Sequence, residues 1–258
     1  MKPSATESLS PEAVAPLLAA AKSLSSAVSQ LSFSPPVAHV YNPLEYAWAP
    51  HQAYVERFAV RGVRAVFVGM NPGPFGMMQT GVPFGEVAAV RDWMGIEASV
   101  APVPGAHPRR PIEGFACRRS EVSGRRLWGW AARRFGSPQA FFAQCFVLNY
   151  CPLVFLEASG RNFTPDRLPK AELAPLQAAC DAHLRAAVAA LAPAWVIGIG
   201  GYARTRIEAA LGPGETSAPR VDQILHPSPA SPAANRGWEP AVDQQLARLQ
   251  VFPDLQLT

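Results

Sequence analysis

The 258-residue sequence has few of the features that mark a metal protein or a membrane protein. It contains four cysteines, with no Cys-x-x-Cys pair and no histidine at ligand spacing, so an iron–sulfur or zinc site is disfavoured. No apolar run approaches the roughly 20 residues that span a bilayer, and the first residues lack the apolar segment of a signal peptide. We expect a soluble intracellular protein with buried free thiols. The cysteines are Cys117, Cys145, Cys151 and Cys180.

Lysine is also scarce, since Lys2, Lys22 and Lys170 are its only occurrences. None of them directly follows a segment that we predict to be a strand. Schiff-base chemistry on a sugar needs an amine close to the reacting carbon. The sequence therefore disfavours a lyase mechanism.

The composition that remains suits one core of ordinary size. Hydrophobic residues make up 49% of the chain, and the mean hydropathy is +0.05. The formal net charge of +4 permits a polyanionic partner but does not require one. We expect residues 1–35 to form a disordered tail followed by a helix, and residues 36–258 to form a single catalytic domain.

Eight arginines fall within 26 residues, together with Trp128 and Trp130. This pattern is more often a solvated helix face above a buried aromatic seam than a nucleic-acid-binding patch. It supports a nucleic-acid partner only weakly. The arginines are Arg109, Arg110, Arg118, Arg119, Arg125, Arg126, Arg133 and Arg134.

Four apolar runs are typical of buried strands, and the segments between them are long enough for crossover helices. This spacing predicts an α/β fold with a parallel sheet that is covered by helices on both faces. We expect helices over Pro11–Leu31, capped by Ser10, and near His51–Ala59, joined by a connecting segment. The predicted strands are Arg64–Val68, Cys145–Leu148, Trp195–Ile199 and Val221–Leu225.

Ligands of such sheets bind beyond the carboxyl ends of the strands, so the strand exits are the places to search for chemistry. The four exits read GMNPGPFG, NYCPLVF, GGYARTRIEAAL and HPSPASPAANRGW. Asn71, Asn149 and His226 stand at three of them, each with a proline shortly after it that stiffens the exit. A lone histidine is usually a core residue, but its place at a strand end favours a functional role for His226.

Two other interpretations of the exits are weaker. The residues from Gly198 to Ala203 match the G-x-G-x-x-A dinucleotide fingerprint, but the nearest acidic residue, Asp222, lies at the beginning of the next strand rather than at its end. Ser228 lacks both a G-x-S-x-G elbow and an evident acidic partner, which argues against a serine hydrolase.

Two long motifs, GMNPGPFGMMQTGVPFGEV and HPSPASPAANRGW, resemble those of the single-strand-selective monofunctional uracil-DNA glycosylases, a family of the uracil-DNA glycosylase superfamily. The resemblance continues through VYNPLEYAWAPH, RDWMGI, EVSGRRLWGW and NYCPLVFLEASGRNFTP, and it covers roughly residues 40 to 250. It implies a three-layer αβα sandwich with a central four-stranded parallel sheet. That architecture agrees with the strand prediction.

The resemblance implies that Asn71 positions the water that attacks the anomeric carbon, and that His226 donates a hydrogen bond to uracil O2. Base departure leaves an anionic uracil, so a donor aimed at O2 stabilises charge that develops mainly in the transition state. An amide has no useful basicity, so Asn71 would orient water without acting as a true general base. The sequence does not show whether the imidazole is neutral or cationic.

Four further residues would bind the base by the same resemblance. Phe84 would stack on it, and the Asn149 amide would accept from N3–H and donate to O4, a pattern that cytosine does not match. Gly73 would leave room beside C5 for oxidised methyl groups, and Met70 would line the pocket.

The HPSP segment would form a wedge that enters the duplex and fills the place of the flipped nucleotide. Ser228, Pro229, Ala230 and Ser231 would contact DNA there. Ala230 departs from the family, whose members often carry arginine at this place, so the preference between single and double strands is open. We hypothesise that Arg236 or Arg161 compensates by holding phosphates.

The predicted function is therefore DNA repair: the protein flips uracil or a 5-modified uracil, such as 5-hydroxymethyluracil, and hydrolyses the N-glycosidic bond. It would leave an intact abasic site, with no cofactor and no metal. Its partner would be single-stranded and duplex DNA with damaged bases, and not a membrane, and we expect a monomer. We expect cytoplasmic localisation with the bacterial nucleoid, or nuclear localisation if the source is eukaryotic.

Three alternatives remain open. The same scaffold would also suit a non-catalytic binder of damaged or single-stranded DNA, or a glycosylase for the deaminated purines xanthine and hypoxanthine. A small-molecule hydrolase or nucleotide-binding enzyme that uses the Gly198 turn is the third.

Overall fold

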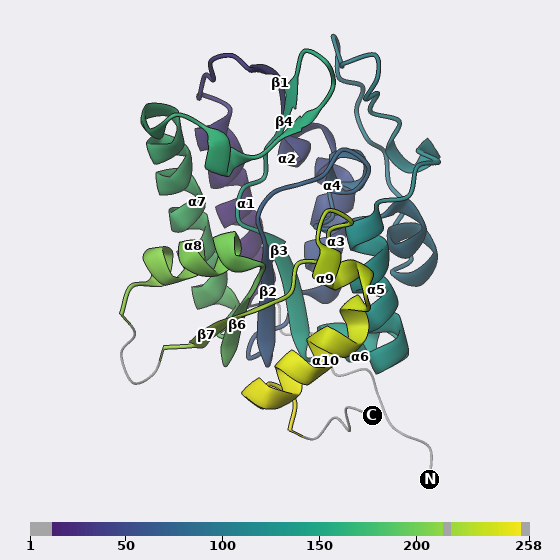
Figure 1. Cartoon of the computed structure of the whole chain (residues 1–258), viewed down its shortest axis with the longest axis vertical. Coiled ribbons are helices and arrows are strands. Elements are labelled where there is room, and N and C mark those ends of the chain that lie inside the picture. Colours follow the sequence, from purple (N-terminus) through teal and green to yellow (C-terminus); the bar gives the residue numbers. More distant parts are fainter. Residues whose placement is uncertain (1–11, 214–217, 254–258) are drawn as a thin grey trace.

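The central element of the computed structural model, which describes residues 12–213 and 218–253, is a four-stranded parallel sheet in the order β3-β2-β6-β7 (Figure 1). Every residue of the first three strands in this order is buried, as expected for strands covered on both faces. The four predicted strands are confirmed, with ends that differ by no more than one residue. They are β2 (Ala65–Gly69), β3 (Cys145–Asn149), β6 (Trp195–Ile199) and β7 (Arg220–Ile224).

Helices cover both faces of this sheet and complete the three-layer αβα sandwich (Figure 1). Helices α1 (Val14–Val28), α7 (Lys170–Leu191) and α8 (Gly201–Leu211) pack together on one side. On the other side lie α5 (Val122–Phe135), α6 (Pro138–Phe142) and α10 (Trp238–Leu249). The other helical segments are α2 (Pro43–Tyr46), α3 (Trp48–Phe58), α4 (Met77–Thr80), η1 (Ala89–Trp93), η2 (Gly114–Ala116), η3 (Pro165–Arg167) and α9 (Pro232–Asn235).

The first two helices differ at their ends from the prediction. Helix α1 begins at Val14 without a side-chain cap, while Pro11 and the predicted cap Ser10 lie outside the described residues. Helix α3 begins three residues before the predicted His51, at Trp48. Helix ends depend on tertiary contacts as well as on local signals, so differences of this size are ordinary.

A second sheet was not predicted. Strands β1 (Val37–Tyr41), β4 (Val154–Glu157) and β5 (Asn162–Phe163) form a small antiparallel sheet in the order β1-β4-β5. The sequence prediction treated β1 as part of a connecting segment, which is wrong. Its five residues alternate irregularly between buried and exposed, and they pair with a strand more than 100 residues away, so no local pattern reveals them.

The tryptophans of α5 and the four cysteines are buried in the core. Trp128 and Trp130 are buried in one aromatic cluster with Phe141, which supports the solvated-helix interpretation of the arginines on α5. All four cysteines are buried free thiols, as predicted. Among the described residues, none of the helices combines the length and the apolarity that a membrane span requires.

Candidate active site

A pocket of about 510 Å³ opens where β2, β3 and β7 end. It is the place that the strand-exit argument predicts for chemistry. Eight of the twelve predicted site residues line it: Met70, Asn71, Gly73, Phe84, Asn149, His226, Ser228 and Pro229. Their proposed roles stay predictions, but the structure brings these residues to one cavity although Met70 and Pro229 are 159 positions apart.

The Asn71 side chain has a defined orientation. Its Nδ2 donates to the backbone oxygen of Leu153 at 3.2 Å and, more weakly, to that of Pro72 at 3.3 Å. Because both donors of the amide group point to the backbone, Oδ1 is the atom left to accept from a ligand or a water. The Asn71 amide is therefore oriented so that its carbonyl oxygen can accept a hydrogen bond from a water molecule.

His226 is held as a neutral donor. The backbone N–H of Ser228 donates to its Nδ1 at 3.0 Å, so the proton of a neutral ring is on Nε2. Burial lowers the pKa of His226 below the ordinary 6.5, which favours this neutral form further. Nε2–H is thus available as a donor to a ligand, and protonation at Nδ1 would place two N–H groups against each other.

Asn149 carries a buried acceptor without a partner. The residue is only 7% exposed, and its Nδ2 contacts the sulfur of Met77 at 3.3 Å. Its Oδ1 has no hydrogen-bond partner within residues 12–213 and 218–253. Leaving such a group unsatisfied costs about 1–3 kcal/mol, which a ligand N–H would recover.

Phe84 lies against this amide in a strained backbone conformation. Its φ is +53°, in the left-handed region that non-glycine residues rarely adopt. The indole Nε1 of Trp128 donates to its backbone oxygen at 3.0 Å and holds the residue there. The Phe84 ring lies 6.3 Å from the imidazole of His226, so both rings face the same cavity.

Gly69 makes this packing sterically possible. In the register of the parallel sheet it lies opposite Asn149. A Cβ at Gly69 would approach Asn149 Oδ1 and the Phe84 ring to 2.5 Å, closer than real Cβ contacts. By contrast, a Cβ at Gly73 would have no neighbour nearer than Glu121 Oε1 at 3.8 Å, so space remains there.

The wedge segment, His226–Ser231, is held by hydrogen bonds from Arg126 and Asn235. Arg126 donates to the backbone oxygens of Pro227 at 2.9 Å and Ser228 at 3.4 Å, and to Asn235 Oδ1 at 2.9 Å. Asn235 in turn donates to the backbone oxygen of Pro229 at 2.8 Å. The segment that carries His226 is therefore tied to α5 and α9.

Four predicted DNA-contacting residues lie outside the pocket lining. Ala230 and Arg236 are exposed, and Ser231 caps α9 by accepting from the N–H of Ala234 at 3.3 Å. Arg161 is exposed as well, and it pairs with Glu157 at 3.2 Å. These positions keep the residues accessible, but they do not test phosphate binding.

The sequence prediction missed several pocket residues. Glu121 caps α5 by accepting from the N–H groups of Ser123 at 3.1 Å and Gly124 at 2.5 Å, and burial raises its pKa. Glutamate is not one of the residues that usually cap a helix start, so no local signal marked this cap. Phe75 lies in the predicted strand exit GMNPGPFG but was given no role there. The fold alone brings Ser120, Asn162 and Thr164 to the pocket.

The alternative chemistries find little support at this site. Within the described part of the chain no cluster of three or more His, Cys, Asp or Glu side chains suits a metal ion. The glycine turn after β6 packs against His226, since a Cβ at Gly200 would lie 3.2 Å from that of the histidine. Lys22 contacts the ring of Trp48 at 5.2 Å and Lys170 begins α7, so neither lines the pocket.

Known proteins resemble this chain along most of its length. Residues 56–255 match the model of the uracil DNA glycosylase superfamily. The single-strand selective monofunctional uracil-DNA glycosylase of Rattus norvegicus is 50% identical over 230 residues, which are 89% of this chain and 82% of that protein. The Bos taurus protein of the same description is 47% identical over 230 residues, which are 89% and 84% of the two chains.

A solved structure shares the fold at low identity. The crystal structure of Pedobacter heparinus SMUG2 superposes with a TM-score of 0.62 and is 18% identical, over 91% of this chain and 98% of that one. At this identity the likeness concerns the architecture alone.

We expect Gly69→Ala to lower the free energy of unfolding by about 1–3 kcal/mol, because the added Cβ must displace the Asn149 amide or the Phe84 ring. Gly73→Ala is the matched control and should change it by no more than about 0.5 kcal/mol. Urea unfolding of both variants measures the difference. Equal destabilisation by the two substitutions would contradict the steric argument.

We expect His226 to titrate below pH 6.5 and to keep its proton on Nε2 above that midpoint. NMR titration of the ring signals, assigned by comparison with His226→Gln, measures both properties. Since the lowered pKa disfavours the charged ring in the fold, His226 should destabilise the protein as the pH falls below 6.5. A midpoint at or above 6.5, or a proton on Nδ1, would show that burial and the Ser228 contact do not govern this ring.

Proposed function

Because this chain belongs to the uracil-DNA glycosylase superfamily, we propose that it is a monofunctional uracil-DNA glycosylase of base excision repair. It binds DNA, receives an extruded uracil in the pocket at the ends of β2, β3 and β7, and hydrolyses the N-glycosidic bond. The product is an intact abasic site. Relatives with this activity in their names are about half identical over 89% of the chain, so the proposal rests on more than the fold.

The single observation that carries the proposal is the unsatisfied Oδ1 of Asn149. A buried acceptor on a residue that lines a pocket selects a ligand that offers a donor, and uracil offers N3–H. Cytosine has an acceptor at the same place, which would face Oδ1 without a hydrogen bond. The Asn149 amide therefore stabilises bound uracil and destabilises bound cytosine.

The remaining groups suit the chemistry of base departure. Nε2–H of His226 is a neutral donor for O2 of the departing uracil, where negative charge develops in the transition state. Oδ1 of Asn71 accepts from the attacking water, while Leu153 fixes the amide that holds it. Catalysis then comes mainly from leaving-group stabilisation and water positioning, not from a strong base.

A lyase step is not part of this proposal. It would require an amine that attacks the sugar carbon. The pocket lining contains no lysine, and the two lysines that the structure describes lie on α1 and α7. An attempt to trap a covalent DNA adduct with borohydride should therefore fail.

We extend the proposal to 5-modified uracils. The nearest atom to a Cβ built on Gly73 is 3.8 Å away, so the pocket keeps open space on that side. If C5 of the flipped base faces Gly73, a hydroxymethyl group fits without moving the backbone. Uracil and 5-hydroxymethyluracil would then both be substrates.

Strand preference and assembly also belong to the proposal. The names of the relatives state single-strand selectivity. In this chain the wedge carries Ala230, a short side chain that fills little of the space of a flipped nucleotide. We propose a monomer that prefers single strands to duplexes.

The direct test is cleavage of a labelled uracil oligonucleotide, followed by alkali, in the presence of EDTA. Asn71→Ala should reduce excision at least about 100-fold, because the water loses its acceptor. His226→Ala should reduce it about 100- to 1,000-fold, because the anionic base loses its donor. His39→Ala, which changes a histidine of the outer sheet, is the control and should leave the rate unchanged.

The outcomes of this test are distinct. Strand breaks that appear only after alkali, and that fall sharply in both pocket variants, would support a monofunctional glycosylase with these roles. Binding of DNA without any excision by the native protein would contradict the proposed function.

Substrate range has its own test. Gly73→Tyr should lower excision of 5-hydroxymethyluracil about 10- to 100-fold more than excision of uracil, because the ring would fill the open space. Gly73→Ala adds only a methyl group to the same position and, as the control, should retain both activities. If Gly73→Tyr lowers excision of both substrates equally, C5 of the flipped base does not face this residue.

A further inference from the structure

Two arginines of the basic cluster surround one aromatic ring outside the catalytic groups. The guanidinium carbon of Arg119 lies 4.3 Å from the ring centroid of Phe75, and that of Arg110 lies 5.3 Å from it. Both distances are within the range of a cation–π interaction. Since they refer to the same ring, the two positive charges lie no more than about 10 Å apart, comparable with the Debye length of about 8 Å at physiological salt.

Three arginines of the basic cluster hold other parts of the protein, whereas the Arg110 guanidinium donates, among the described residues, only to the backbone oxygen of Arg109, at 3.2 Å. Arg126 donates to the wedge segment, Arg133 pairs with Glu239, and Arg134 pairs with Asp243 at 3.4 Å. For Arg110 and Arg119, by contrast, residues 12–213 and 218–253 provide no ion-pair partner. Two charges without carboxylate partners therefore remain beside Phe75.

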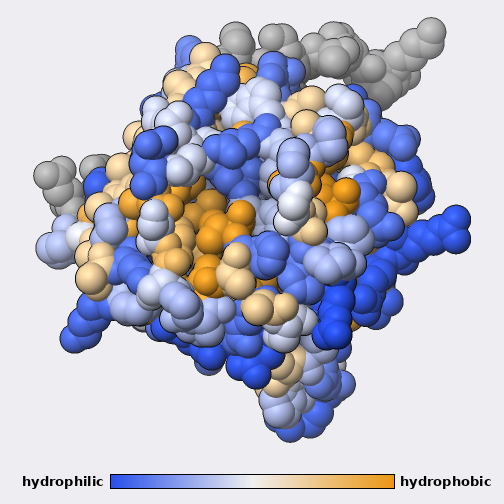
Figure 2. All heavy atoms as spheres, turned by 90° about the horizontal axis from the view of Figure 1, so that it is seen from above, coloured by the Kyte–Doolittle hydropathy of each residue, from blue (hydrophilic) through white to orange (hydrophobic). Residues whose placement is uncertain are grey.

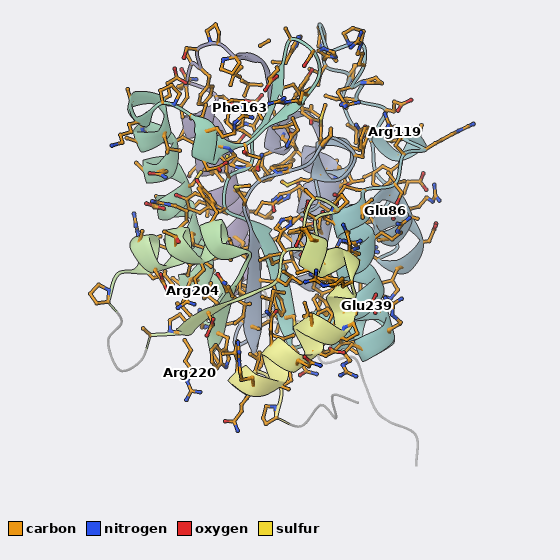
Figure 3. The ribbon with its side chains drawn as sticks, in the orientation of Figure 1. Glu86, Arg119, Phe163, Arg204, Arg220 and Glu239 are labelled. Atoms are coloured by element: carbon orange, nitrogen blue, oxygen red, sulfur yellow. The ribbon has the colours of Figure 1, made fainter. Side chains whose placement is uncertain are left out.

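The two arginines lie next to residues that line the pocket. Phe75 lines the pocket wall, and so does Ser120, the residue after Arg119. The nearby carboxylate of Glu86 already accepts from the Ser120 hydroxyl at 3.0 Å. Arg119 and Glu86 lie on the same side of the molecule, opposite Arg204 and Arg220 (Figure 3). The end of the molecule that carries β1 and β4 displays hydrophobic patches among hydrophilic residues (Figure 2).

We infer that Arg110, Phe75 and Arg119 form a phosphate-binding subsite for the DNA strand beside the flipped nucleotide. The inference rests on the proposed function, because a base that enters the pocket must bring its own backbone across the rim. Guanidinium groups bind phosphate through two parallel N–H groups. The Phe75 ring holds both groups in place before DNA arrives, which reduces the entropy lost on binding.

The two arginines of this subsite lie outside the pocket lining and outside the wedge. The subsite contacts backbone, so it contributes affinity and position without reading sequence. Its contribution should depend strongly on salt, because each phosphate that is neutralised releases counterions. It also gives a chemical reason for binding single strands, since a single backbone is enough to occupy it.

The test measures binding of an undamaged, labelled oligothymidine strand by fluorescence anisotropy between about 50 and 200 mM salt. Arg110→Ala and Arg119→Ala should each weaken binding about threefold or more and make the slope of log affinity against log salt shallower by about 0.7. The double variant should change the slope by about 1.4. Phe75→Leu keeps both charges but removes the ring, and it should weaken binding about two- to fivefold.

Arg220→Ala is the matched control. Arg220 is exposed and lies over the ring of Trp195 at 5.3 Å, the same distance as Arg110 from Phe75, but at the first residue of β7 and so at the other end of the sheet. Its removal should leave affinity and slope unchanged. If the Arg110 and Arg119 variants match this control, or if they lose only thermal stability, the subsite does not exist.

A second readout separates this inference from the proposed function. On a long uracil strand the double variant should raise KM about tenfold and leave kcat within about twofold, because the chemical groups are untouched. Absence of any excision would overturn the proposed function alone, whereas an unchanged salt slope would overturn the subsite alone.

Discussion

The close approach of β2 to the Asn149 amide and the Phe84 ring determines the shape of the site. Parallel register places Gly69 opposite Asn149, and the missing Cβ lets the amide and the ring lie against the strand. Phe84 reaches this place only with a left-handed backbone, which the Trp128 indole holds through one hydrogen bond. A sheet position, a strained loop and a buried indole thus jointly fix one wall of the pocket. Strain of this kind persists only where the surroundings over-determine it.

The chemistry that the site offers is that of oriented neutral dipoles. Asn71, Asn149 and His226 each have one polar atom engaged with protein and one left for a ligand. Because neighbours fix the engaged atom, the remaining atom is defined as acceptor or donor before substrate arrives. Such preorganisation suits the departure of an anionic base, where charge appears only in the transition state. Positive charge lies further out, where a phosphate backbone would pass.

Much of this could be predicted from the sequence, and the parts that could not share a physical cause. Buried strands are continuous apolar runs, so β2, β3, β6 and β7 were found to within one residue, and the strand exits led to Asn71, Asn149 and His226. Strand β1 was not predicted, because it pairs with β4, which lies more than 100 residues further along the chain. Trp128 and Arg126 look like members of an amphipathic helix, and only the fold shows that they support Phe84 and the wedge. The roles implied by family resemblance remain predictions.

The measurement that tests the central claim most directly is the paired stability and excision rate of Asn149→Leu. Leucine has a similar size and removes the unsatisfied acceptor, so the account predicts a Tm that is unchanged or raised by about 2 °C. It predicts at the same time that uracil excision falls at least about 100-fold, because the base loses the partner of N3–H. A Tm lowered by more than about 4 °C would show that the fold itself satisfies the amide. That result, or retained excision, would contradict the account.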